Sequence, residues 1–195
     1  MNLVPVVLEG RRIRLEPLTL DHHEPLCKIG LDEEIWRWFP KPVHSREDLL
    51  DYIRTALQWQ ADGTALPFAT IERNSGRAIG STRFMNIDRA NRRVEIGSTW
   101  IAPAWQRTAA NTEAKYAMLR HAFEQLGCIR VELKTDALNE KSRAAILRIG
   151  AKHEGIFRNH VICASGRIRD SAWYSIIDSE WPQVKATLEE RLKTS

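Results

Sequence analysis

The stretch WIAPAWQRTAANTEAKY, residues 100–116, is typical of a strand end, a short loop and the start of a helix. Such a junction often holds a phosphate, because the free N–H groups at a helix N-terminus point toward the ligand. Phosphate-binding loops usually contain glycine, since the backbone must turn sharply and come close to the anion. This stretch has no glycine, and the chain has none anywhere between Gly97 and Gly127. It can therefore be a phosphate site, or a plain connection in which Asn111 is the helix N-cap.

The hydrophobic pattern on either side of this junction predicts the remaining elements. The expected strands are 11–18, 67–73, 77–88, 92–101, 128–136, 152–163 and 167–178. A first helix is expected to begin near Asp21, and further helices are expected at 45–63, 111–126, 139–150 and 180–192. Hairpin-connected strands come first and helix-connected strands follow. This order predicts a mixed sheet of about seven strands in an α/β or α+β layer fold.

The composition is that of one folded domain over residues 1–195, with 43% hydrophobic and 28% charged residues. No apolar run approaches the roughly 20 residues of a membrane span, and no signal peptide is visible. Cys27, Cys128 and Cys163 are scattered, and neither they nor the six histidines show metal-ligand spacing. We therefore expect reduced thiols, no metal and a cytoplasmic location.

The net charge is +4, and arginines cluster at 11–14, 89–93 and 167–169. These clusters fit a solvated surface, a site for a phosphorylated cofactor, or an acidic partner such as RNA. Aromatic-rich RNA-binding motifs are absent, so nucleic acid is not an expected partner. A homodimer is permitted by the pattern but not required by it.

Five segments, in this order, resemble the GNAT N-acetyltransferases and their ribosomal-protein N-terminal acetyltransferase branch, the RimJ/RimL type. They are RIRLEPLTLDH, VEIGSTWIAPAWQ, TEAKYAML, NEKSRAAILRIGA and GRIRDSAWYSIIDSEWP. The resemblance covers the chain from about Arg12 to Trp181. It implies a largely antiparallel sheet with helices on both faces, splayed after the fourth strand, in a single acetyltransferase domain.

The resemblance also implies an activity: acetyl transfer from acetyl-CoA to a primary amine by direct attack in a ternary complex. The acceptor would be a protein N-terminus or a small amine. The residues implied in acetyl-CoA binding are Trp100, Ile101, Gln106, Arg107, Thr108, Ala109, Ala110, Asn111, Thr112, Asn139 and Ser142. Asn139 can instead be only the N-cap of the next helix.

Two departures from the family pattern stand out. The family loop reads Gln/Arg-x-x-Gly-x-Gly/Ala, whereas this chain has Ala109 and Asn111 at the small-residue positions. If position 109 needs a positive φ, alanine costs roughly 1–2 kcal/mol there. Many relatives also carry a tyrosine that protonates the departing thiolate, and Ile146 stands in its place. Ser142 or a water would then serve, and a non-catalytic acetyl-CoA-binding protein is the alternative function.

Glu95 is the candidate that removes the amine proton, because it is the only carboxylate in the strand leading to the loop. The alternative interpretation of Glu95 is a surface strand residue, or an ion-pair partner for Arg92, Arg93 or Arg130. Trp36, Trp38 and Phe39 are candidates for lining the acceptor site, since the family places this segment there. Their alternative is ordinary core packing.

Overall fold

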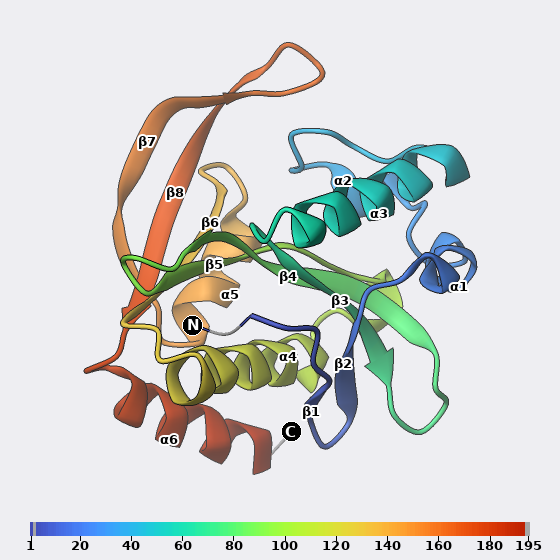
Figure 1. Cartoon of the computed structure of the whole chain (residues 1–195). Helices are drawn as coiled ribbons and strands as arrows, with labels where there is room; N and C mark the ends of the chain where they lie inside the picture. Colours follow the sequence, from blue (N-terminus) through green and yellow to red (C-terminus); the bar gives the residue numbers. More distant parts are fainter. Residues whose placement is uncertain (2, 194–195) are drawn as a thin grey trace.

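The computed structural model describes residues 1 and 3–193 (Figure 1). The strands are β1 (Leu8–Glu9), β2 (Ile13–Pro17), β3 (Leu66–Glu72), β4 (Ala78–Asp88), β5 (Arg93–Ile101), β6 (Arg130–Asp136), β7 (Lys152–Ile162) and β8 (Ile168–Ile177). The helices are α1 (His23–Cys27), α2 (Glu33–Trp36), α3 (Arg46–Ala61), α4 (Ala109–Arg120), α5 (Glu140–Arg148) and α6 (Trp181–Lys193). Short turns are 3₁₀ η1 (Leu20–His22), 3₁₀ η2 (Pro103–Trp105) and π-helical η3 (His121–Gln125).

The strands form one eight-stranded sheet in the order β1-β2-β3-β4-β5-β6-β8-β7. Neighbours are antiparallel except β5 and β6, which are parallel. The mixed, largely antiparallel sheet is therefore confirmed. The strand beyond the expected seven is β1, whose two residues are too few to show an alternating pattern.

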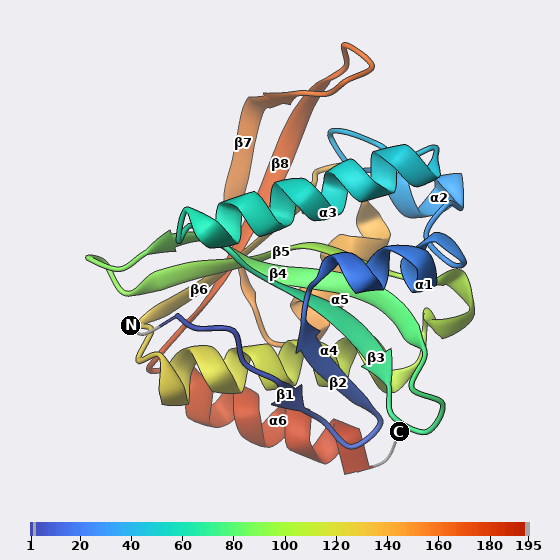
Figure 2. The same cartoon turned by 45° about the vertical axis from the view of Figure 1, so that its right-hand side comes forward.

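Helices cover both faces of the sheet (Figures 1 and 2). One core lies under α1, α2 and α3 and includes Leu26, Trp36, Ile53 and Trp100. The other lies under α4 and α6 and includes Val94, Ile96, Met118 and Leu188. Side chains alternate between these two cores along each strand, so the strand that leads to the predicted loop sends side chains to both faces.

The sequence signals for α3 are confirmed, and those for the first and fourth helices need correction. Ser45 caps α3, because its side chain accepts a hydrogen bond from the Asp48 N–H at 3.1 Å. The helical segment expected near Asp21 is a 3₁₀ turn followed by two short helices. The helix expected at 111–126 begins at Ala109 and passes into the π-helical turn η3, so it is not a regular α-helix throughout.

Among the described residues, no helix has the length and apolar character needed to cross a membrane.

Candidate functional site

The sheet opens between β5 and β6. These strands pair only from Arg93 to Glu95 and from Arg130 to Glu132. Beyond these residues the β6-facing edge of β5 has no ladder partner, although β6 stays paired with β8 as far as Asp136. We call this opening the split. Every second backbone N–H and C=O of a strand points to such an edge, so the end of β5 offers hydrogen-bonding groups to an extended ligand. The expected splay after the fourth predicted strand is found here.

A β-bulge bends β5 within the split. Ser81 pairs with Trp100 and Arg83 with Gly97, so one residue of β4 faces two of β5. Ser98, in the bulge, has a φ of +46°. Its carbonyl accepts a hydrogen bond from the Tyr52 hydroxyl at 3.0 Å, which ties the bulge to α3.

The loop that follows β5 adopts its left-handed conformation at Arg107, with φ +62°, and not at Ala109. Thr108 caps α4: its hydroxyl accepts from the Ala110 N–H at 3.2 Å and donates to the Trp105 carbonyl at 2.8 Å. Ala109 is already the first helical residue. The expected cost of alanine at 109 therefore does not arise, and Asn111 is not the N-cap.

Gln106 connects this loop to its surroundings. Its side-chain amide donates to the Ile101 carbonyl at 3.1 Å, and its side-chain oxygen accepts from Lys141 at 2.8 Å. The loop is thereby held between the end of β5 and the first turn of α5.

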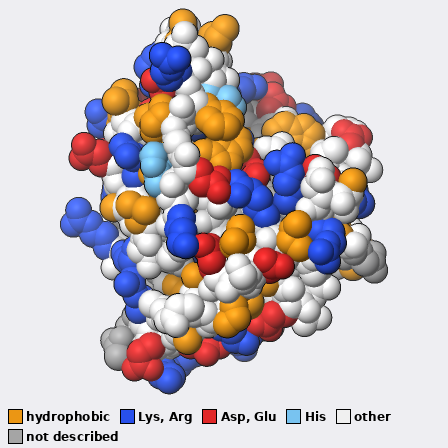
Figure 3. Space-filling view, turned by 90° about the vertical axis from the view of Figure 1, so that its left-hand side faces the viewer, with side chains coloured by type: hydrophobic (Ala, Val, Ile, Leu, Met, Phe, Trp, Pro, Cys, Tyr) orange, Lys and Arg blue, Asp and Glu red, His pale blue; other side chains and the backbone are white. Residues whose placement is uncertain are grey.

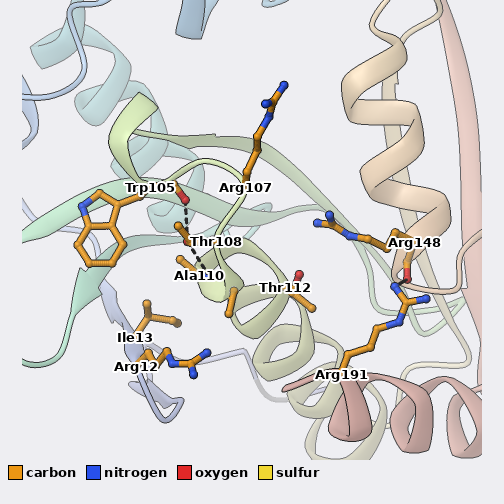
Figure 4. Close-up of a pocket in the computed structure, with 10 residues that line it drawn as sticks. Arg12, Ile13, Trp105, Arg107, Thr108, Ala110, Thr112, Arg148 and Arg191 are labelled. Carbon is orange, nitrogen blue, oxygen red and sulfur yellow. Dashed lines mark hydrogen bonds between the residues drawn. The ribbon is translucent and has the colours of Figure 1, made fainter. Parts of the chain in front are cut away.

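A cavity of about 670 Å³ lies at the N-terminus of α4 (Figure 4). Four arginines line it, and we call it the arginine hollow: Arg12 from β1–β2, Arg107 from the loop, Arg148 from α5 and Arg191 from α6. Arg191 donates to the Arg148 carbonyl at 2.9 Å. Guanidinium groups around a helix N-terminus favour an anion, because both the charges and the helix dipole attract it.

Thr108, Ala109, Ala110 and Thr112 also line the arginine hollow. These four predicted residues are thus brought together with Arg107. No sequence signal marks Arg148 or Arg191, because they lie on separate helices far along the chain. Arg12 stood out only as part of a basic cluster.

Glu95 is buried, with 2% of its surface exposed. Its neighbours Val94 and Ile96 pack in the α4 core, so Glu95 points to the opposite face. Its carboxylate accepts from the Asn86 side chain at 2.8 Å and from Lys134 Nζ at 2.8 Å.

The alternatives for Glu95 are therefore wrong, since it is neither on the surface nor bonded to the expected arginines. Arg93 instead pairs with Asp88 and Glu132, and Arg130 pairs with Glu132 and Glu154.

Aromatic side chains of the β7–β8 hairpin lie next to the Glu95–Lys134 pair. Lys134 Nζ is 4.8 Å from the ring centroid of Trp173, which stacks on Phe157 at 4.5 Å. His160 contacts the Ser171 hydroxyl at 2.9 Å. Burial, with the nearby charges of Lys134 and Arg169, lowers the pKa of His160 below its usual value. Figure 3 shows hydrophobic and histidine side chains gathered on this side, beside acidic and basic groups.

The three aromatic candidates of the 36–39 segment have different places. Trp36 is 1% exposed, donates to the Gly30 carbonyl at 2.7 Å and packs against Trp100, so it is a core residue. Phe39 is half-buried against Trp36. Trp38 is also half-buried; its carbonyl accepts from Arg169 at 3.4 Å, and its ring lies 6.0 Å from the Arg167 guanidinium. Trp38 thus reaches the β7–β8 hairpin.

Asn139 and Ser142 lie at the start of α5. The Asn139 side chain accepts from the Ser142 N–H at 3.0 Å, so the N-cap interpretation is confirmed. Ile146 is buried in the core with α4. Trp100 is 3% exposed and packs in the α3 core, which leaves only its backbone available in the split.

Among the described residues, no group of three or more metal-ligating side chains comes together, and all three cysteines are buried thiols.

Comparison with known proteins assigns the family. The model of the acetyltransferase (GNAT) domain matches residues 12–152. The chain belongs to this family and is an acyltransferase.

Three relatives illustrate the match. YdaF of Bacillus subtilis, whose name assigns it provisionally to the ribosomal N-acetyltransferases, is 36% identical over 106 residues, which is 54% of this chain and 57% of that protein. A GCN5-related N-acetyltransferase from Brucella melitensis has a TM-score of 0.88 at 35% identity, covering 96% of this chain and 86% of that one. Mycobacterium smegmatis RimJ, solved with CoA-disulfide, shares the fold with a TM-score of 0.83 at 22% identity, covering 96% and 95%.

Proposed function

We propose that the protein transfers an acetyl group from acetyl-CoA to a primary amine by direct attack in a ternary complex. The acceptor is a protein N-terminus or a small amine, and the reaction takes place in the cytoplasm. The observation that carries the proposal is that Glu95, the open edge of β5 and the arginine hollow follow one another along the path of the chain from β5 to the N-terminus of α4.

The residues present suit the parts of acetyl-CoA. The arginine hollow and the amides at the start of α4 suit its phosphates. The open edge of β5 around Trp100 and Ile101 suits the pantetheine arm, which carries amide groups that can pair like a strand. Gln106 and Asn139 lie at either side of this path, on the loop and at the start of α5.

The acceptor side is the face that Glu95 shares with Trp38 and the β7–β8 hairpin. Glu95 would take a proton from the incoming ammonium, directly or through a water. Lys134 holds the Glu95 carboxylate in one orientation through its 2.8 Å contact. Trp173 and Phe157 offer flat apolar surface for a group next to the amine.

The experiment has two arms. Calorimetry with acetyl-CoA tests binding, for which we expect a micromolar dissociation constant, about −8 kcal/mol. Release of the CoA thiol is then followed with a panel of peptides with free N-termini and of small amines. Arg148→Ala should weaken acetyl-CoA binding, whereas Arg54→Ala, exposed on α3, is the matched control. Absence of binding at millimolar acetyl-CoA would overturn the proposal, and binding without turnover on any amine would favour a non-catalytic role.

A further inference from the structure

Lys115, in the middle of α4, is a buried charge without a counter-ion. Its residue exposure is 7%. Its Nζ donates to the Thr99 hydroxyl at 2.5 Å and lies 3.5 Å from the Thr82 hydroxyl. Among the described residues, no carboxylate oxygen lies within 4 Å of it. Burial lowers the pKa of Lys115 to about 7. A buried ammonium usually has an ionic partner, so this arrangement needs an explanation.

Two carboxylates are candidates to pair with Lys115, Glu113 by its place in the sequence and Glu95 by its charge, and both are bonded elsewhere. Glu113, two residues earlier on α4, accepts from the backbone N–H groups of Arg11 and Arg12 and fixes the β1–β2 turn. Glu95 is close enough to raise the pKa of Lys115, but Asn86 and Lys134 hold its oxygens. Within the part of the chain that the structure describes, the hydrogen-bond partners of Lys115 Nζ are thus the hydroxyl groups of Thr82 on β4 and Thr99 on β5.

The position of Thr99 places Lys115 at the split. Thr99 lies in the part of β5 beyond Glu95, where pairing with β6 has ended. It belongs to the same bulged stretch as Ser98 and is half-exposed, while the lysine behind it is buried. The Lys115 ammonium thus lies under β4 and β5, and the hydroxyl of Thr99 stands between it and the open part of β5.

Glu95 and Lys115 approach the split from opposite faces of the sheet. Glu95 points toward the α3 and hairpin side, because its strand neighbours pack in the α4 core. Lys115 comes from α4 itself. In acyl transfer from a thioester, the nucleophile and the leaving sulfur are bonded to the same carbon, and a base is needed on one side and an acid on the other. The two residues provide that arrangement.

We propose that Lys115 supplies, through the hydroxyl of Thr99, the proton that the departing thiolate takes up; this rests on the proposed function. The amine nitrogen bonds to the acyl carbon, and the carbon–sulfur bond breaks with its electron pair going to sulfur. The Thr99 hydroxyl gives a proton to that sulfur and takes one from Lys115 Nζ, which becomes a neutral amine. The proton lost by the attacking amine goes to Glu95 and then to solvent, and Lys115 regains a proton from water that reaches Thr99.

This assignment fits the chemistry better than the earlier candidate, Ser142. A free thiol has a pKa of about 8.5, and an ammonium group whose pKa lies near 7 is a suitable donor to it. A serine hydroxyl is a far weaker acid. Ser142 also sits at the first turn of α5, where its N–H is bonded to Asn139.

The test uses the equilibrium ionisation of bound CoA as well as turnover. Calorimetry first confirms that wild type and Lys115→Met bind CoA. The ultraviolet absorbance of the thiolate is then followed with pH in each complex. We expect the bound thiol of the wild type to ionise at least about one pH unit below that of Lys115→Met, since an adjacent cation favours the anion. The value of kcat at neutral pH should fall about 10²-fold in Lys115→Met.

Lys115→Arg separates proton donation from charge alone. Arginine keeps a cation beside the sulfur but does not release its proton, so the thiol should still ionise at low pH while kcat stays low. Melting temperatures of all variants verify folding. If the bound CoA thiol has the same pKa in the wild type and in Lys115→Met, the role of Lys115 is overturned, and the proposed function is not affected. Recovery of wild-type kcat in Lys115→Arg also overturns that role. Absence of CoA binding to the wild type overturns the proposed function instead.

Discussion

The burial of Lys115 predicts an unusual dependence of stability on pH. In the unfolded chain its pKa is near the ordinary 10.5, and in the folded protein burial lowers it to about 7. Between these values the unfolded chain binds more protons than the folded protein, so the free energy of unfolding rises with pH. The stability cost of the charge is therefore present in full below pH 7 and disappears above about pH 10.5.

The magnitude follows from the size of the shift. One pKa unit corresponds to about 1.4 kcal/mol, so charging Lys115 in its buried site costs at most about 5 kcal/mol. Lys115→Met removes this cost and the hydrogen bonds to Thr99 and Thr82, each worth about 1 kcal/mol. We expect Lys115→Met to be more stable than the wild type at pH 7. The advantage should shrink by up to about 4 kcal/mol when the pH is raised to 10.

Urea unfolding of both proteins at several pH values between 7 and 10 measures this difference. Cys128 also contributes, because its thiol ionises in this range in the unfolded chain, whereas burial raises its pKa to about 11 in the folded protein. Its effect is common to both proteins and cancels in the comparison. Lys28→Met, at an exposed position after α1, is the matched control and should show no pH-dependent difference. If the difference in the free energy of unfolding between the wild type and Lys115→Met is constant over the whole pH range, the conclusion that Lys115 is a buried ammonium without a counter-ion is refuted.

Three further predictions concern the site. Glu95→Gln should lower kcat about 10²-fold, less at high pH where more amine is deprotonated; a pH profile of kcat measures this, and an unchanged kcat removes Glu95 from the mechanism. Trp38→Ala should raise KM for the acceptor with little change in melting temperature, whereas Trp36→Ala should cost roughly 3–5 kcal/mol of stability; thermal melts beside acceptor kinetics show whether the two differ. Arg107→Gly should weaken acetyl-CoA binding in calorimetry while relieving backbone strain, and Ala109→Gly should leave that affinity unchanged; tighter binding of Ala109→Gly would contradict the observed loop.

The elements of the fold were predictable where a local signal decides the structure. Ser45 before an apolar periodic stretch marks the start of α3, and Gly63 follows it with a φ of +70°. The turn at residues 74–76 likewise contains Gly76 with a φ of +67°. Local signals failed for η3, because nothing in residues 121–125 distinguishes a π-helical turn from an α-helix. They failed for β1 because two residues show no period.

The site was only partly predictable, because its charges meet through tertiary contacts. Sequence proximity suggested an arginine partner for Glu95, but strand pairing brings Lys134 of β6 beside it. Sequence spacing singled out the loop, but not Arg148 and Arg191, which come from two later helices. Nothing in the sequence distinguishes Lys115 from an exposed helix lysine, and only the packing of α4 against the sheet shows that it is buried.

The loop can form the proposed anion site without glycine, because its strained residue is not the one that the family pattern marks. A positive φ costs a non-glycine residue roughly 1–2 kcal/mol, and this chain places it at Arg107. The same residue is an arginine that lines the arginine hollow. A glycine there would relieve the strain but remove the charge, whereas Ala109, inside the first helical turn, favours the helix more than glycine would. In the proposed complex, the strain is therefore located at a residue whose side chain would offset it by binding the anion.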